Sequence, residues 1–182
     1  MDIKTNSLQG VLVIKPKIYR DSRGFFMESW NERRYADVQA GAGFVQDNIS
    51  FSYRGTLRGL HFQNPNAQGK LLSVLHGEVF DVAVDLRRNS PTFGRSEGVF
   101  LNEENKFQFY IPQGFAHGFL VLSEIALFHY KCTDYYSPKD ELTIRWDDPD
   151  LAIQWPIREP RLSERDAKAP FLRDIPKERL FE

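Results

Sequence analysis

A few histidines are the residues of this chain best suited to proton chemistry. His61 lies in a short apolar run between Leu60 and Phe62, and His117 lies in the glycine-rich segment PQGFAHGF. A neutral imidazole can accept a proton near neutral pH, and loops often carry functional residues. Either histidine could therefore be a general base. Each one also fits an ordinary packing role, and the residue types leave both interpretations open.

The other candidate groups would supply an acid, a cation and phosphate contacts. Tyr130 and Tyr136 flank the end of a predicted strand, where a tyrosine can donate a proton or simply pack its ring. Lys70 lies in a hairpin-like loop, where most lysines are only solvated. Arg23 and Arg58 carry guanidinium groups whose geometry suits phosphate. Together these residues supply a base, a weak acid, a cation and phosphate ligands.

Several familiar kinds of site are missing from the sequence. The four histidines show no HxH or HExxH spacing, and Gln63 stands two residues after His61, where an HxH pair would need a second histidine. There is no GxGxxG, Walker A, CxxC or GxSxG pattern. We therefore expect neither a metal nor a cofactor.

The composition is that of an ordinary globular domain. The chain has 182 residues, of which 41% are hydrophobic, and 24 Lys and Arg balance 25 Asp and Glu. This balance excludes a disordered chain and gives no overall basic surplus for nucleic acid. Cys132 is the single cysteine, which fits a reducing compartment, and no apolar run approaches the ~20 residues of a membrane span. We expect one domain over residues 1–182, located in the cytoplasm, without a nucleic-acid or membrane partner.

Short runs rich in Phe, Tyr and Val, separated by turn residues, predict an all-β fold. The predicted strands are 11–14, 25–29, 44–51, 57–63, 71–75, 78–86, 97–101, 107–111, 118–122, 125–131 and 142–146. Their spacing is typical of an antiparallel sandwich or barrel and not of βαβ units. Helices are predicted for only two segments, residues 32–39 capped by Asn31 and residues 164–168 capped by Ser163.

The strand predicted at 78–86 has one apolar face, and its other face carries Asp81 and Asp85. A solvated sheet face explains this alternation. The two carboxylates could instead point into the interior of a small barrel that holds a ligand. The pattern leaves both interpretations open.

Long runs of the chain, in unbroken order, are more specific than any short motif. They are DSRGFFMESWN (21–31), FVQDNISFS (44–52), LRGLHFQ (57–63), AQGKLLSVLHGEVFDVAVDLR (67–87), SPTFG (90–94), IPQGFAHGFLVLS (111–123), YKCTDYYSP (130–138), WDDPDLAIQWP (146–156) and LSERDA (162–167). These runs resemble the dTDP-4-dehydrorhamnose 3,5-epimerases of the cupin superfamily. The resemblance implies a cupin-type jelly roll, an antiparallel double-sheet barrel with a few short peripheral helices. It also implies a homodimer, with no metal and no cofactor.

The resemblance also implies roles for individual residues. His61 corresponds to the general base, Asp166 to its supporting carboxylate and Tyr130 to the acid, with Lys70 near the sugar 4-oxygen. Tyr136 would stack near the thymine. Further contacts to the nucleotide and sugar are implied for Arg23, Glu28, Gln46, Asp47, Asn48, Arg58, His117, Glu141 and Arg165. Arg165 stands where the family often has lysine, which preserves the charge but changes the donor geometry.

The implied reaction is epimerisation of dTDP-4-dehydro-6-deoxy-D-glucose at C3 and C5 to dTDP-4-dehydro-L-rhamnose. The 4-keto group acidifies both C–H bonds, and reprotonation from the opposite face inverts the carbon. The same residues would serve a mono-epimerase or a ketoisomerase acting on a related nucleotide sugar. A third alternative is a non-catalytic cupin that binds a sugar nucleotide. Binding alone would not require a base, a supporting carboxylate and an acid, so we favour the enzyme.

Overall fold

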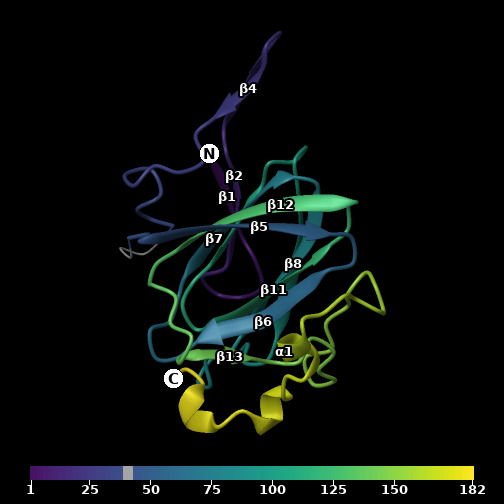
Figure 1. The fold of residues 1–182 in the computed structure, drawn as a ribbon. Helices are drawn as coiled ribbons and strands as arrows, with labels where there is room; N and C mark the ends of the chain where they lie inside the picture. Colours follow the sequence, from purple (N-terminus) through teal and green to yellow (C-terminus); the bar gives the residue numbers. More distant parts are fainter. Residues whose placement is uncertain (39–42) are drawn as a thin grey trace.

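Two antiparallel sheets form the body of the protein in the computed structural model, which describes residues 1–38 and 43–182 (Figure 1). The six-stranded sheet has the order β1 (Asp2–Thr5), β2 (Leu12–Lys15), β10 (Gln108–Ile111), β7 (Lys70–His76), β12 (Ile125–Cys132) and β5 (Gln46–Tyr53). The five-stranded sheet has the order β13 (Glu141–Thr143), β6 (Leu57–Gln63), β11 (Phe115–Val121), β8 (Glu78–Asp85) and β9 (Ser96–Asn102). The predicted all-β, double-sheet class is therefore confirmed.

The core lies between the two sheets and follows from the two-residue period of their strands. Val79 and Ala83 of β8 and Phe119 of β11 face Phe109 of β10 and Phe128 of β12 in one buried cluster. Side chains of a strand alternate between its two faces, so every second residue of these strands reaches the core. The resulting sandwich holds β6, β7, β11 and β12 in fixed positions, and these strands carry five of the candidate residues, Arg58, His61, Lys70, His117 and Tyr130.

The strand β8 is buried on both faces, so its interpretation as a strand with a solvated face is wrong. Asp81 and Asp85 have no exposed surface, and they share the inward face with Val79 and Ala83. The opposite face is covered by the C-terminal segment, whose Leu172 packs in the second apolar cluster. The acidic face can point into the interior because each carboxylate is paired there, Asp81 with the buried His117 and Asp85 with the half-buried Arg87, as a buried charge requires.

Helices are few and short, as expected, but one of the two predicted helices is wrong. The helix α1 (Glu164–Ala167) begins at Ser163, whose hydroxyl accepts a hydrogen bond from the Asp166 backbone. Two further 3₁₀ turns are η1 (Leu172–Asp174) and η2 (Lys177–Arg179). Residues 32–38 form turns instead of the predicted helix, and position 39 lies outside the described residues.

The failed helix prediction has a local cause. Asn31 does accept hydrogen bonds from the backbone of Arg33 and Arg34, as a cap would. Tyr35, however, is pulled into the core, where its hydroxyl donates to Gln108 at 2.8 Å. A short helix gains little by itself, so this buried contact determines the local conformation.

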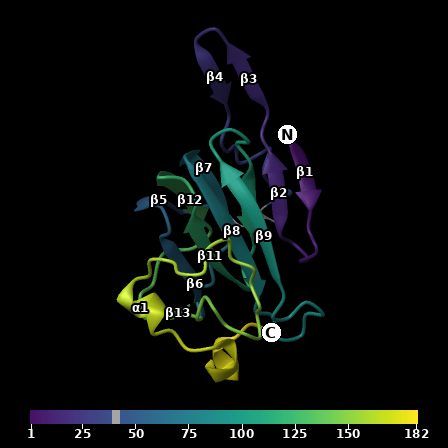
Figure 2. The same cartoon turned by 90° about the vertical axis from the view of Figure 1, so that its right-hand side faces the viewer.

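A two-stranded hairpin, β3 (Ile18–Asp21) and β4 (Gly24–Met27), projects away from the sheets (Figure 2). It is rich in exposed aromatic side chains, including Tyr19, Phe25 and Phe26. The strands β1 and β3 were not predicted. Within the described residues, no helix has the length and apolar character needed to cross a membrane.

Candidate active site

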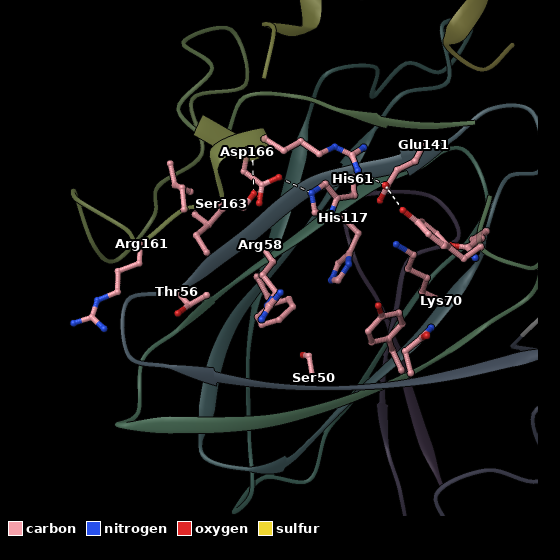
Figure 3. Close-up of a pocket in the computed structure, with 18 of the residues that line it drawn as sticks. Ser50, Thr56, Arg58, His61, Lys70, His117, Glu141, Arg161, Ser163 and Asp166 are labelled. Carbon is pink, nitrogen blue, oxygen red and sulfur yellow. Dashed lines mark hydrogen bonds and ion pairs between the residues drawn. The ribbon is translucent and has the colours of Figure 1, made fainter. Parts of the chain in front are cut away.

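A cavity of about 680 Å³ lies between the two sheets, beside β6 and α1 (Figure 3). This volume suits a small-molecule ligand. Eleven of the predicted residues line it: Gln46, Asn48, Arg58, His61, Lys70, His117, Tyr130, Tyr136, Glu141, Arg165 and Asp166. The fold therefore gathers in one place residues that are up to 120 positions apart in sequence, counted from Gln46 to Asp166.

His61 is held by a carboxylate that comes from the other end of the chain. Its Nε2 lies 2.7 Å from Oδ1 of Asp166, which is nearly fully buried at the start of α1. Burial raises the pKa of Asp166, but hydrogen bonds from groups such as His61 outweigh it, so the pKa lies below its usual value. Asp166 is thus ionised at neutral pH and can only accept. Nε2 must donate, which leaves Nδ1 of the neutral ring as the basic nitrogen.

Two glycines set the position of His61 in its strand. Gly59 on β6 has a φ of +125°, and a Cβ there would lie 2.5 Å from Cα of Gly118 on β11. Only glycine tolerates both this φ and this approach. The close contact brings β6 against β11 so that His61 pairs directly with His117. The two imidazoles therefore occupy neighbouring positions on the same sheet.

His117 has a buried carboxylate of its own. Its Nε2 lies 3.0 Å from both carboxylate oxygens of Asp81, which comes from β8. Burial lowers the pKa of His117 despite the opposing effect of Asp81, so the imidazole is neutral near pH 7. Asp81 thereby holds His117 in one orientation at the cavity wall.

Lys70 and Tyr130 approach the cavity from the other sheet. Lys70 begins β7 and Tyr130 lies on the adjacent strand β12, with the ammonium nitrogen 5.9 Å from the centre of the phenol ring. Burial lowers the pKa of Lys70 and raises the pKa of Tyr130. Tyr130 therefore keeps its proton at neutral pH. His61 on the five-stranded sheet and Tyr130 on the six-stranded sheet line one cavity from opposing sides.

A connected set of polar groups forms one end of the cavity. The Tyr136 hydroxyl donates to Glu141 at 2.8 Å, and Arg165 forms an ion pair with the same carboxylate. The backbone N–H of Tyr136 donates to Gln46 at 2.8 Å, and Gln46 in turn donates to Asn48. The aromatic ring is thus fixed beside amide groups that can donate and accept hydrogen bonds, a combination suited to a planar base.

Three predicted binding residues do not line this cavity. Arg23 is exposed on the β3–β4 hairpin and pairs with Asp21 at 2.7 Å. Glu28 follows that hairpin and forms an ion pair with Arg34. Asp47 projects from the opposite face of β5 to Asn48, and Lys131 donates to it at 2.7 Å. The binding roles of all three stay predictions.

Other cavity residues were not predicted, among them Ser50, Arg161 and Gln68. Ser50 could have been found, because it shares the two-residue period of Gln46 and Asn48 on β5. Arg161 carried no such signal, since it reaches the cavity through a loop that bridges to Thr56. Over residues 1–38 and 43–182, no group of three His, Cys, Asp or Glu side chains is arranged to hold a metal ion.

Comparisons with known proteins show which family the chain resembles. The profile of the dTDP-4-dehydrorhamnose 3,5-epimerase family matches residues 5–174. A protein of that name from Methanothermobacter thermautotrophicus is 51% identical over 177 residues, covering 96% of this chain and 95% of the relative. A protein of the same name from Salmonella typhimurium is 53% identical over 173 residues, covering 93% of this chain and 94% of the relative.

A solved structure gives the same result for the fold. The crystal structure of dTDP-6-deoxy-D-glucose-3,5-epimerase from Legionella pneumophila Philadelphia 1, in complex with dTDP-4-keto-L-rhamnose, superposes with a TM-score of 0.97. It is 54% identical, and the match covers 100% of this chain and 97% of that one. With sequence and fold matched over nearly the full length, the chain belongs to the dTDP-4-dehydrorhamnose 3,5-epimerase family.

Proposed function

We propose that this protein epimerises dTDP-4-dehydro-6-deoxy-D-glucose at C3 and C5, with His61 as the base and Tyr130 as the acid. Membership of the family carries the activity, an isomerase reaction. One observation carries the assignment of the residues: His61 and Tyr130 line a single cavity from opposing sheets. A sugar ring bound between them would present one face to each.

The first step would be removal of a proton next to the ketone. Nδ1 of His61 takes the proton from C5 or C3, and the electron pair of that C–H bond moves into an enolate on the 4-oxygen. Asp166 stabilises the imidazolium that forms, and such a positioned base contributes about 10²–10⁴-fold to the rate. Lys70, whose ammonium lies on the cavity beside Tyr130, would stabilise the enolate oxygen.

The second step would return a proton from the other face. Tyr130 donates its phenolic proton to the carbon as the enolate collapses to the ketone, and the carbon is inverted. The raised pKa of Tyr130 supports this role because the hydroxyl is protonated until the enolate forms. His61 then releases its proton to water and Tyr130 takes one back from water, so the same two groups can act on the second carbon.

The nucleotide would be bound at the polar end of the cavity. Tyr136 is fixed by Glu141 and Gln46 in a position to stack on thymine. Arg58 and Arg165 line the cavity together with Arg161, and guanidinium groups pair well with a diphosphate. The solved Legionella relative contains a dTDP-sugar, which supports this part of the proposal.

We propose further that the protein acts as a homodimer in which the β3–β4 hairpin of one subunit completes the cavity of its partner. Arg23 lies on this hairpin and Glu28 follows it, and both lie outside the cavity of their own chain. The exposed aromatic side chains of the hairpin also suit a protein interface.

A mixed-subunit experiment tests this arrangement. Arg23→Ala and His61→Ala chains, each impaired alone, are mixed and allowed to exchange subunits. Half of the cavities in a mixed dimer would combine an intact His61 with an intact Arg23, so activity should return on mixing. No recovery, in samples shown to contain mixed dimers, would contradict the shared site.

The proposed reaction needs neither a metal nor a cofactor, because the substrate ketone itself stabilises the carbanion. Exhaustive chelation should leave turnover unchanged. Activity that disappears with the chelator and returns with one specific metal would contradict this. We also propose that the protein works as a single domain in the cytoplasm, where Cys132, a buried free thiol, would stay reduced.

Solvent deuterium incorporation tests the proposed function directly. The substrate is incubated with the protein in deuterated buffer, and NMR locates the label. A 3,5-epimerase labels C3 and C5, whereas His61→Ala should label neither. Labelling of one carbon would identify a mono-epimerase, and a protein that binds the nucleotide sugar without labelling it would be non-catalytic.

A further inference from the structure

One strand presents a row of four polar side chains toward the cavity side of its sheet. Gln46, Asn48, Ser50 and Ser52 alternate along β5 and therefore share one face. Three of them have hydrogen-bond partners. Gln46 and Asn48 bond to each other, and Ser52 accepts from Nε of Arg58 at 3.1 Å. Ser50 is the exception, because its buried hydroxyl has no partner among the described residues.

An unpaired buried hydroxyl is destabilising, so its presence calls for an explanation. Ser50 lines the cavity, and Figure 3 shows it on the floor of the cavity below Arg58 and His117. Rotation about one side-chain bond aims its oxygen at a group that enters the cavity. A serine hydroxyl can both donate and accept, which matches the hydroxyl of a sugar.

We propose that Ser50 binds the 2-hydroxyl of the sugar and so fixes the ring between His61 and Tyr130. This inference rests on the proposed function. The 4-dehydro-6-deoxy sugar has only two hydroxyls, on C2 and C3. The 3-hydroxyl is on a reacting carbon and changes face during the reaction, whereas C2 never reacts. A group fixed on a rigid strand can therefore hold only the 2-hydroxyl through both inversions.

The test compares two stable ligands that differ only at this position, dTDP-glucose and dTDP-2-deoxyglucose. Calorimetry should show that the unmodified protein binds dTDP-glucose about 5-fold more tightly, the effect of one neutral hydrogen bond of about 1 kcal/mol. In Ser50→Ala this preference should fall to about 1-fold. The melting temperature of Ser50→Ala should be unchanged or higher, because the substitution removes an unpaired hydroxyl.

Ser73→Ala is the matched control, since Ser73 is also a buried strand serine but accepts a hydrogen bond from Gln108 outside the cavity. It should lower the melting temperature and keep the preference. A preference that persists in Ser50→Ala would overturn the proposal, as would a melting temperature that falls as in Ser73→Ala without a change in binding. The binding test needs no turnover, so failure of the proposed function is seen separately in the deuterium assay. If dTDP-glucose did not bind the unmodified protein at all, the role of Ser50 would be overturned, and the deuterium assay would still decide the proposed function.

Discussion

His61 and Asp166 are separated by 105 positions in the sequence, yet their side chains meet at 2.7 Å. We expect Asp166→Asn to reduce kcat by at least about 10²-fold, because an amide can no longer fix the Nε2–H tautomer or stabilise the imidazolium. Binding of dTDP-glucose should be nearly unchanged. The measurement is steady-state turnover together with calorimetry. A variant with more than a tenth of the original kcat would show that the carboxylate is dispensable.

Tyr130 is the residue whose removal should separate two events that normally occur together. In Tyr130→Phe the ring still packs against Phe128, and only one hydroxyl is lost. His61 can still remove a proton and return it to the same face. The variant should therefore incorporate solvent deuterium while its inverted product falls by about 10²-fold or more. NMR of the recovered nucleotide sugar measures both.

Equal loss of exchange and inversion in Tyr130→Phe, with binding intact, would contradict the donor role. It would assign Tyr130 to proton removal instead. His61→Ala is the control, since it should abolish both events.

Individual site residues could be predicted from the sequence where they belong to long motifs. They could not be predicted where their role depends on contacts between distant segments. His61, Lys70 and Tyr130 belong to runs that could be matched in order. The pairing of His117 with Asp81 could not be predicted, because it depends on the register of β11 against β8. The outward direction of Asp47 follows from which face of β5 is buried, and its neighbours in sequence do not determine that.

The close approach of the neighbouring strands β6 and β11 at Gly59 and Gly118 is the feature on which the site depends. Gly59→Ala would place a Cβ 2.5 Å from Gly118 Cα at a positive φ, and neither backbone can yield without moving His61. We expect a loss of about 2–4 kcal/mol in the free energy of unfolding, with a matching loss of activity. Urea denaturation provides the measurement.

Gly43→Ala is the control for Gly59→Ala, because a Cβ at Gly43 meets nothing within 4 Å. Its unfolding midpoint should stay within the error of the unmodified protein. If Gly59→Ala were as stable as Gly43→Ala, the close approach would not be needed to position the strands.

The strands whose ends were predicted best are rich in buried apolar residues. The strands β6, β8 and β12 were placed within a residue or two of their observed ends. In contrast, β1 consists of exposed residues, DIKT, and is a strand only because it pairs with β2. The segment after Asn31 was predicted as a helix but forms turns. Its capping residue is present, but the burial of Tyr35 determines the local conformation.

For the whole molecule, Asp85 connects stability to pH. Burial alone would raise its pKa, but hydrogen bonds from Arg87, Ser90 and Thr92 dominate and bring the pKa to about 2 from its usual 3.8. A depressed pKa means that the carboxylate stabilises the fold above pH 3.8, and this contribution disappears as the pH falls toward 2. A shift of nearly two units corresponds to about 2–3 kcal/mol.

Asp85→Asn should therefore lower the free energy of unfolding by about 2–3 kcal/mol at pH 7. The difference in this free energy between the variant and the unmodified protein should shrink as the pH falls from 4 to 2. Urea titrations across this range provide the check. Asp21→Asn is the control, because Asp21 forms an exposed ion pair with Arg23. This substitution should change the free energy of unfolding little at any pH. If the difference in the free energy of unfolding between Asp85→Asn and the unmodified protein stayed constant with pH, the low pKa of Asp85 would be contradicted.

The projecting hairpin has a consequence for how the rate depends on the amount of protein. If the arginine that completes a site is carried by another chain, as proposed, a lone chain has an incomplete site, and specific activity is no longer constant. It should fall on dilution, as dimers separate, so that a plot of rate against total protein curves upward at its low end. Chains that are themselves inert, such as His61→Ala, would then protect the diluted enzyme, because each still offers a hairpin to a neighbour.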